Sequence, residues 1–206
     1  KGERVGIVGA SGAGKTVLTR ALVGVLPKGL SVTAGTVERF GRQTLISQHP
    51  ASGLPPLLSA LAVVAEAARW HPRTAGDPSP ESLLEEMGIA PSAFGKRPHQ
   101  LSGGMARRVA LAAGIATGAD VVLLDEPTSG LDALVAADVQ ALLLRIALER
   151  ELGILVATHD RRLIRDFCSR VIVLRGGRVV AEGEVRELAA GHADPYVREL
   201  LPEVLS

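Results

Sequence analysis

The chain has 206 residues, which suits one domain, or one domain carrying a subdomain, and 47% of them are hydrophobic but only 2% aromatic. The net charge of +1 gives no indication of a nucleic-acid surface, and the single cysteine, Cys168, excludes an intrachain disulfide framework and a cysteine-rich metal site. No apolar run approaches the ~18 residues of a membrane-spanning helix, and no signal peptide is recognisable. We expect a soluble protein of a reducing compartment that could still dock to a membrane partner.

The first motif is a glycine-rich loop between a predicted strand at residues 5–8 and a predicted helix that begins near residue 17. Its spacing, G-x-x-x-x-G-K-[ST], is that of a nucleoside triphosphate site, in which backbone N–H groups and the helix start surround phosphate oxygens. The lysine of such a loop contacts the β- and γ-phosphates, and the hydroxyl binds Mg²⁺. A flexible turn with a solvated lysine is the alternative, and the flanking strand and helix argue against it. The predicted ligands are Gly9, Ser11, Gly12, Ala13, Gly14, Lys15 and Thr16.

The segment after the first helix changes character near residue 49. Residues 31–48 predict short strands with turns at 34–35 and 40–41, the last strand covering residues 44–47. Frequent prolines then separate two predicted helices, 57–70 and 80–87, with a connection at 71–79 that we expect to be mobile. This part therefore predicts a mostly helical insertion.

A second candidate anion site begins at Ser102, which is well placed to cap a helix that ends near Thr117. The two residues that follow, Gly103 and Gly104, leave backbone donors unhindered at the helix start. An ordinary Ser-Gly-Gly cap is the alternative. One nucleotide needs only one such helix start, so this second one raises the question of a second nucleotide.

Two acidic residues follow a continuous apolar run at residues 121–124, which predicts a buried parallel strand. Asp125 would stand at the carboxyl end of this strand, where it can bind Mg²⁺ next to Thr16. Glu126 can accept a proton from an attacking water. A surface pair of acids is the alternative, and the phosphate loop earlier in the chain argues against it.

The rest of the chain alternates helices and strands. We predict a helix at 133–150, a strand at 154–157, a helix at 161–168, a hairpin of 171–174 with 178–181, and terminal helices at 184–190 and 195–201. The alternation predicts a three-layer α/β fold with a mostly parallel sheet. We expect a single domain over 1–206, with a core at 1–48 and 118–206 and a helical subdomain at about 49–117.

Six motifs follow one another along the chain, at residues 9–16, 48, 101–105, 123–127, 129–132 and 159. Together and in this order they resemble the motifs of the ATP-binding-cassette (ABC) ATPases, which have a P-loop NTPase core. The resemblance implies that Gln48 senses Mg²⁺ and the γ-phosphate, and that His159 contacts the γ-phosphate beside the base Glu126. It implies that Ser102, Gly103 and Gly104 bind the nucleotide of a partner in trans, although Met105 stands where many members have glutamine. The implied dimer-interface loop is Ser129, Gly130, Leu131 and Asp132.

A narrower resemblance is to importer ATPases for peptides, opines and nickel, through residues 24–27, 48–50, 98–105 and 195–198. The sequence lacks the C-terminal cysteine cluster that many oligopeptide importer ATPases carry, which slightly favours the nickel or metal-chelate type of importer. The family's N-terminal antiparallel strands and adenine-stacking aromatic are also absent, so either the chain is a fragment or adenine is bound differently. Residues 1–3 resemble the turn before the loop strand, which favours a fragment.

The resemblance implies an ATP- and Mg²⁺-dependent energy-coupling subunit of an importer at the cytoplasmic face of the cell membrane. Its partners would be a second ATPase subunit bound head to tail, membrane permease subunits and a substrate-binding protein, with no nucleic acid. One alternative is a soluble cassette ATPase that remodels nucleic acid or ribosomes, but the long coiled-coil insertion or second cassette usual in those is not in this sequence. Another is a non-hydrolysing module, against which Glu126 and His159 argue.

Overall fold

The strands of the protein form one twisted sheet. The computed structural model describes residues 2–39, 41–48, 53–71 and 76–201. Within these residues the strand order is β2-β3-β4-β1-β5-β6, and only β6 runs antiparallel to its neighbour. The strands are β1 (Arg4–Val8), β2 (Gln43–Ile46), β3 (Val121–Asp125), β4 (Gly153–Thr158), β5 (Arg170–Arg175) and β6 (Arg178–Glu184).

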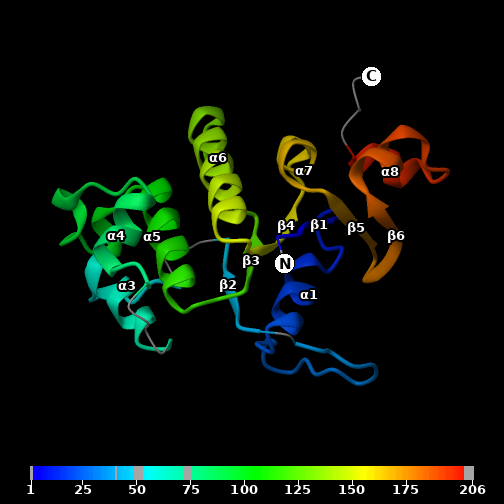
Figure 1. The fold of residues 1–206 in the computed structure, drawn as a ribbon. Helices are drawn as coiled ribbons and strands as arrows, with labels where there is room; N and C mark the ends of the chain where they lie inside the picture. Colours follow the sequence, from blue (N-terminus) through cyan, green and yellow to red (C-terminus); the bar gives the residue numbers. More distant parts are fainter. Residues whose placement is uncertain (1, 40, 49–52, 72–75, 202–206) are drawn as a thin grey trace.

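Helices cover both faces of this sheet. Alternate strand residues face opposite sides: Ile154 and Val156 of β4 belong to a large apolar cluster, whereas Ala157 packs with Ile7 in a smaller one. Helix α1 lies on one side of the sheet and α6 and α7 on the other (Figure 1). The described helices are α1 (Lys15–Leu22), α3 (Ala60–Ala68), α4 (Pro80–Glu86), α5 (Gly103–Ala116), α6 (Ala133–Glu149), α7 (Arg161–Phe167), α8 (Val185–Gly191) and α9 (Pro195–Leu200), with 3-10 turns at Pro91–Ala93 and Pro98–Gln100.

The helices α3, α4 and α5 pack on one another at one end of the sheet, where α5 also lies against β2 (Figure 1). Ser59 and Ser79 cap α3 and α4 with their hydroxyls. Arg150, at the end of α6, donates to both carboxylate oxygens of Glu86 at the end of α4, at 2.6 and 3.3 Å. The division into a core and a helical subdomain at 49–117 stays a prediction.

The three-layer α/β fold and its mostly parallel sheet are confirmed, and most element boundaries lie within a few residues of those expected. The short strands expected before residue 43 are wrong, because residues 31–39 form no strand and their side chains are almost all exposed. A strand needs a partner for its backbone donors and acceptors, and no described segment supplies one there. Parts of two other expectations, the turn at 40–41 and the mobile connection at 71–79, fall outside the described residues.

The register of the sheet brings the carboxyl ends of three strands to one edge. Val8 of β1 is paired with Thr158 of β4, and Asp125 of β3 with Ala157 of β4. The segments that follow these strands therefore begin at the same level, side by side. This edge is where open parallel sheets bind ligands.

Candidate nucleotide site

The glycine-rich loop is tightly folded between β1 and α1. A Cβ atom on Gly9 would lie 2.5 Å from the carbonyl oxygen of Leu174, so only glycine fits there. Gly14 caps α1 with φ of 102°, a left-handed conformation that favours glycine. The Lys15 ammonium group donates to the carbonyl oxygens of Gly9 and Ala10 at 2.9 and 3.3 Å. The helix start and the ammonium group give this loop the positive character that a phosphate requires.

A hydroxyl and a carboxylate meet beside the loop. Thr16 donates from Oγ1 to the Asp125 carboxylate, at 2.9 Å from Oδ2 and 3.2 Å from Oδ1. Burial raises the pKa of Asp125, and the hydrogen bond from Thr16 opposes that shift. Hydroxyl and carboxylate oxygens are the ligands that Mg²⁺ prefers, and this cation usually retains waters and substrate phosphates as its other ligands. The pair therefore fits a Mg²⁺ site next to the phosphate loop.

The second acid, Glu126, is positioned by its backbone and by two side chains from the end of β4. Its φ of 50° lies in the left-handed region, which is uncommon and strained for a residue other than glycine. Its Oε1 lies 2.8 Å from Nδ1 of His159, and its Oε2 accepts from Thr158 at 3.3 Å. The Glu126 side chain is 11% exposed and that of His159 is 68% exposed. The carboxylate is therefore largely buried, and the imidazole that contacts it lies at the surface.

These groups surround one open cavity of about 510 Å³, within the usual range of small-molecule sites. The predicted residues Gln48, Glu126 and His159 line it together with most of the phosphate loop, namely residues 11–17. Asp125 reaches the site through its bond to Thr16. The predicted ligand Gly9 does not line the cavity, but its carbonyl oxygen accepts a hydrogen bond from Lys15. The structure thus brings together the residues predicted for the chain's own nucleotide, and the roles of these residues stay predictions.

The segments predicted to act at a dimer interface lie outside that cavity. Ser102 caps α5 by accepting from the backbone N–H of Met105 at 3.2 Å, and a Cβ on Gly103 would meet no atom within 4 Å. In the other segment, Ser129 accepts from the Gln48 side chain at 3.4 Å, and Asp132 caps α6. Ser102 and Gly103 are exposed and the helix start does not line the cavity. Its role towards a second nucleotide stays a prediction.

Two residues around the site were missed by the sequence reasoning. The Tyr196 hydroxyl accepts from the backbone N–H of Ala10 at 3.0 Å and donates to the carbonyl of Leu174 at 2.9 Å. Arg107 is buried in α5 and donates to backbone carbonyls of two site loops. Arg107 has the same helical phase as Leu111 and Gly114, a signal that places it on a buried face. Tyr196 stands in a tail segment noted only for resemblance, and no local pattern links it to the loop.

The single cysteine lies apart from this site. Cys168 is buried, and its burial raises the pKa of the thiol to about 12. The thiol is therefore protonated near neutral pH, and a protonated, buried thiol is a poor nucleophile and a poor metal ligand.

The family of the chain follows from its sequence as well as from this site. The profile of the ABC transporter family matches residues 1–129, more than half of the chain. The fold is that of the P-loop cassettes, and the chain belongs to the ABC transporter family. Among the described residues, no helix has both the length and the apolar character needed to cross a membrane.

Two curated relatives are ATP-binding proteins of transport systems. The chain is 34% identical to the peptidoglycan transport ATP-binding protein YejF of Agrobacterium fabrum, over 97% of this chain and 39% of the relative. It is also 34% identical to the probable D,D-dipeptide transport ATP-binding protein DdpF of Escherichia coli, over 98% of this chain and 66% of the relative. The chain thus spans between about two fifths and two thirds of the length of these relatives.

A solved structure shares the fold. The dimeric ATP-binding cassette MJ0796, in a post-hydrolysis state bound to ADP and phosphate, superposes with a TM-score of 0.70 and 25% identity. The similarity covers 89% of this chain and 85% of that chain.

Proposed function

We propose that this chain is the ATP-hydrolysing, energy-coupling subunit of a membrane importer of peptides, nickel or related small solutes. The observation that carries the proposal is the single cavity that joins the phosphate loop to the hydrogen-bonded pair Glu126 and His159. The relatives named for peptidoglycan and dipeptide transport support the importer class.

In the proposed reaction, the loop N–H groups and Lys15 bind the phosphates, and Thr16 and Asp125 would hold Mg²⁺. Bound there, Mg²⁺ would neutralise charge on the phosphate oxygens. Glu126 accepts a proton from the water whose oxygen attacks the γ-phosphorus, and the bond to the leaving ADP oxygen breaks. His159 orients the Glu126 carboxylate through the 2.8 Å contact. Gln48 lines the same cavity, where its side chain senses Mg²⁺ and the γ-phosphate in the proposed reaction.

The substitution Glu126→Gln tests the base. It keeps the shape of the side chain but removes the proton acceptor, so ATP should still bind while turnover falls by at least about 100-fold. Glu149→Gln, on the exposed face of α6, is the control and should keep the parent rate. Turnover of the Glu126→Gln variant at the parent rate would contradict the assignment.

A head-to-tail ATPase pair is the second part of the proposal. With ATP, the slow Glu126→Gln variant should run as a dimer in size-exclusion chromatography with light scattering. Adding Ser102→Arg should abolish that dimer and leave ATP binding unchanged, because Ser102 caps an exposed helix start that lies outside the chain's own cavity. A dimer that persists would exclude residues 102–104 from the interface.

The permease contact is proposed for the hollow between β2, α3 and α5, next to Gln48. It has a volume of about 200 Å³ and is lined mostly by small side chains such as Ala67, Ala110 and Gly114. The nearby Leu57 is 78% exposed. Purification of the tagged chain from its native membranes should recover permease subunits and a substrate-binding protein, and Leu57→Asp should reduce that recovery without changing ATP turnover. Recovery of ribosomes or DNA instead would overturn the importer proposal.

A further inference from the structure

Arg107 is a buried arginine in α5 that joins two loops of the site. The residue is only 8% exposed. Its Nη2 atom donates to the carbonyl oxygen of Gln48 and to that of Ser129, both at 3.3 Å. It lies little more than one helical turn beyond the helix start at 102–104. A single guanidinium group thus links α5 to the loop of Gln48, which lines the cavity, and to the proposed interface loop at Ser129.

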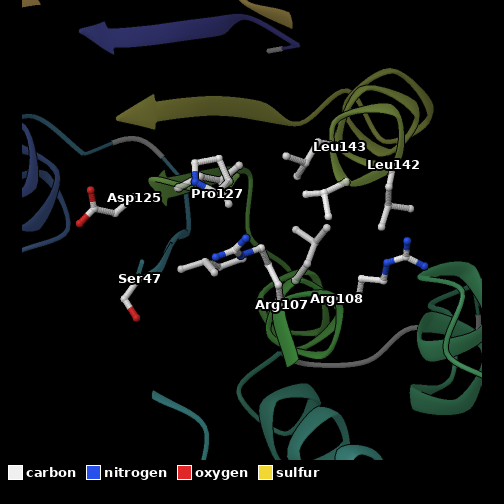
Figure 2. Close-up of a pocket in the computed structure, with 11 residues that line it drawn as sticks. Ser47, Arg107, Arg108, Asp125, Pro127, Leu142 and Leu143 are labelled. Carbon is white, nitrogen blue, oxygen red and sulfur yellow. The ribbon is translucent and has the colours of Figure 1, made fainter. Parts of the chain in front are cut away.

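The surroundings of Arg107 are those of a poorly compensated charge. Its Nη1 atom is buried and has no hydrogen-bond partner among the described residues. Burial lowers the pKa of Arg107. Figure 2 shows apolar side chains of α6, Leu142 and Leu143, in the small cavity beside it, and an Asp125 carboxylate that points away from it. Burying a charge without a charged partner costs stability, and this cost offsets part of what the two hydrogen bonds of Arg107 contribute to the fold.

The two acceptors of Arg107 belong to loops that also contact each other. Gln48 lines the nucleotide cavity, and its side-chain amide donates to the Ser129 hydroxyl at 3.4 Å. The bonds from Arg107 fix the backbone on both sides of that contact. A movement of α5 would therefore act on the backbone of both loops, whereas without the guanidinium the loops would keep their contact with each other but lose these bonds to α5.

We propose that Arg107 is a positioning residue that couples the placement of α5, and hence the helix start at 102–104, to the orientation of Gln48 and Ser129. Arg107 itself lies outside the nucleotide cavity and acts through these two loops. The inference rests on the proposed ATP hydrolysis, because its effect is measured as turnover.

The decisive variant is Arg107→Met, which has similar length but no charge and no donors. We expect its melting temperature to be unchanged or higher and its affinity for a fluorescent ATP analogue to stay within about twofold. Its kcat should fall about tenfold or more, because small displacements of positioned groups have effects of that size. Arg107→Lys retains a donor that can reach a carbonyl, and it should recover part of the lost kcat.

Arg108→Met is the matched control on the same helix. Arg108 is partly buried, contacts the carbonyl of Met87 and lies 4.0 Å from Asp138, and among the described residues it has no hydrogen bond to Gln48 or Ser129. Its variant should keep kcat within about twofold of the parent.

The outcomes separate this inference from the function on which it rests. An unsubstituted chain that hydrolyses no ATP, tested with its native partners, contradicts the proposed function. An active parent whose Arg107→Met variant matches Arg108→Met in kcat overturns the coupling. A variant that does not fold, or that loses turnover only in step with its stability, also overturns it, because the side chain is then structural.

Discussion

The buried carboxylate of Asp125 lowers the stability of the fold at neutral pH, although the proposed Mg²⁺ site requires it. Burial raises the pKa of its carboxyl, so the folded state binds a proton more tightly than the unfolded state does. The stability contribution of this group is therefore fully present at low pH and is lost as pH rises through its folded pKa. At neutral pH, folding must desolvate a carboxylate, which the Thr16 hydroxyl compensates only in part.

We predict that Asp125→Asn raises the free energy of unfolding at pH 7 by about 0.5–2 kcal/mol, the size usual for relief of a strained functional site. The gain should disappear as the pH falls below the usual range of an aspartate, where both states of the parent are protonated. Urea unfolding at pH 7 and at the lowest pH that keeps the fold measures it. The same variant should lose Mg²⁺-dependent ATP hydrolysis.

Asp138→Asn on the exposed face of α6 is the control and should change stability by less than about 0.5 kcal/mol at either pH. An equal gain from Asp125→Asn at both pH values would show that burial of the charge is not the cause.

The site residues that the sequence predicted are those that belong to a local motif, in which adjacent residues indicate the role of each one. Lys15 and Thr16 follow a loop of fixed spacing, and Asp125 and Glu126 follow a buried strand. Arg107 differs, because its bonds reach 59 residues back to Gln48 and 22 residues forward to Ser129. A helix pattern can show that such a residue is buried, but only the tertiary packing shows which backbone atoms accept its hydrogen bonds.

At the scale of elements, the phosphate loop is supported by the last helix and by the β5–β6 turn. Tyr196 of α9 bonds Ala10, and the backbone N–H of Gly177 donates to the carbonyl of Ala13 at 3.0 Å. The Tyr196 ring also lies 5.0 Å from the guanidinium carbon of Arg175. The loop is thus held at its beginning and in its middle by elements from the end of the chain.

We predict that Tyr196→Phe weakens ATP affinity about threefold to tenfold, because one hydrogen bond to the loop is worth about 1 kcal/mol. The ring and its contact with Arg175 remain, so the melting temperature should change by only a few degrees. Titration with a fluorescent ATP analogue measures the loss. Arg175→Gln removes the ring contact but leaves the hydroxyl, and an equal loss of affinity in that control would contradict a role for the hydrogen bond.

The elements that the sequence predicted best are the buried ones. Helix α5 and strand β3 match their expected ranges within a residue or two, because a serine cap marks the helix and a continuous apolar run marks the strand. Residues 31–39 carry isolated apolar side chains such as Val32, which is 54% exposed, and the alternation there predicted strands that do not form. Strand formation depends on a neighbour elsewhere in the molecule, which local alternation does not reveal.

At the scale of the whole molecule, ion pairs and hydrogen bonds join the cluster of α3, α4 and α5 to α6. The bridge between Glu86 and Arg150 is largely buried, with side-chain exposures of 18% and 27%. Arg145 also donates to the carbonyl oxygen of Glu86 at 2.7 Å. The end of α4 is thus tied to α6 by two arginines.

We predict that Glu86→Ala lowers the free energy of unfolding by about 1–3 kcal/mol, because it leaves Arg150 without its carboxylate. Amide hydrogen exchange should quicken in α3 and α4 and stay unchanged in β1 and β4. Glu149→Ala removes an exposed partner of Arg145 and should cost less than about 0.5 kcal/mol. Exchange that quickens equally in all elements would contradict a local role for the bridge.

The strand order also determines when the nucleotide site can form during synthesis. The loop at residues 9–16 precedes both strands that flank β1 among the described residues, β4 and β5, which end at residues 158 and 175. Until those residues have left the ribosome, β1 lacks the two strands that flank it in the folded structure, and the loop lacks their support. The loop is therefore made well before the strands that support it, and a nascent chain that stops before β4 should not bind ATP.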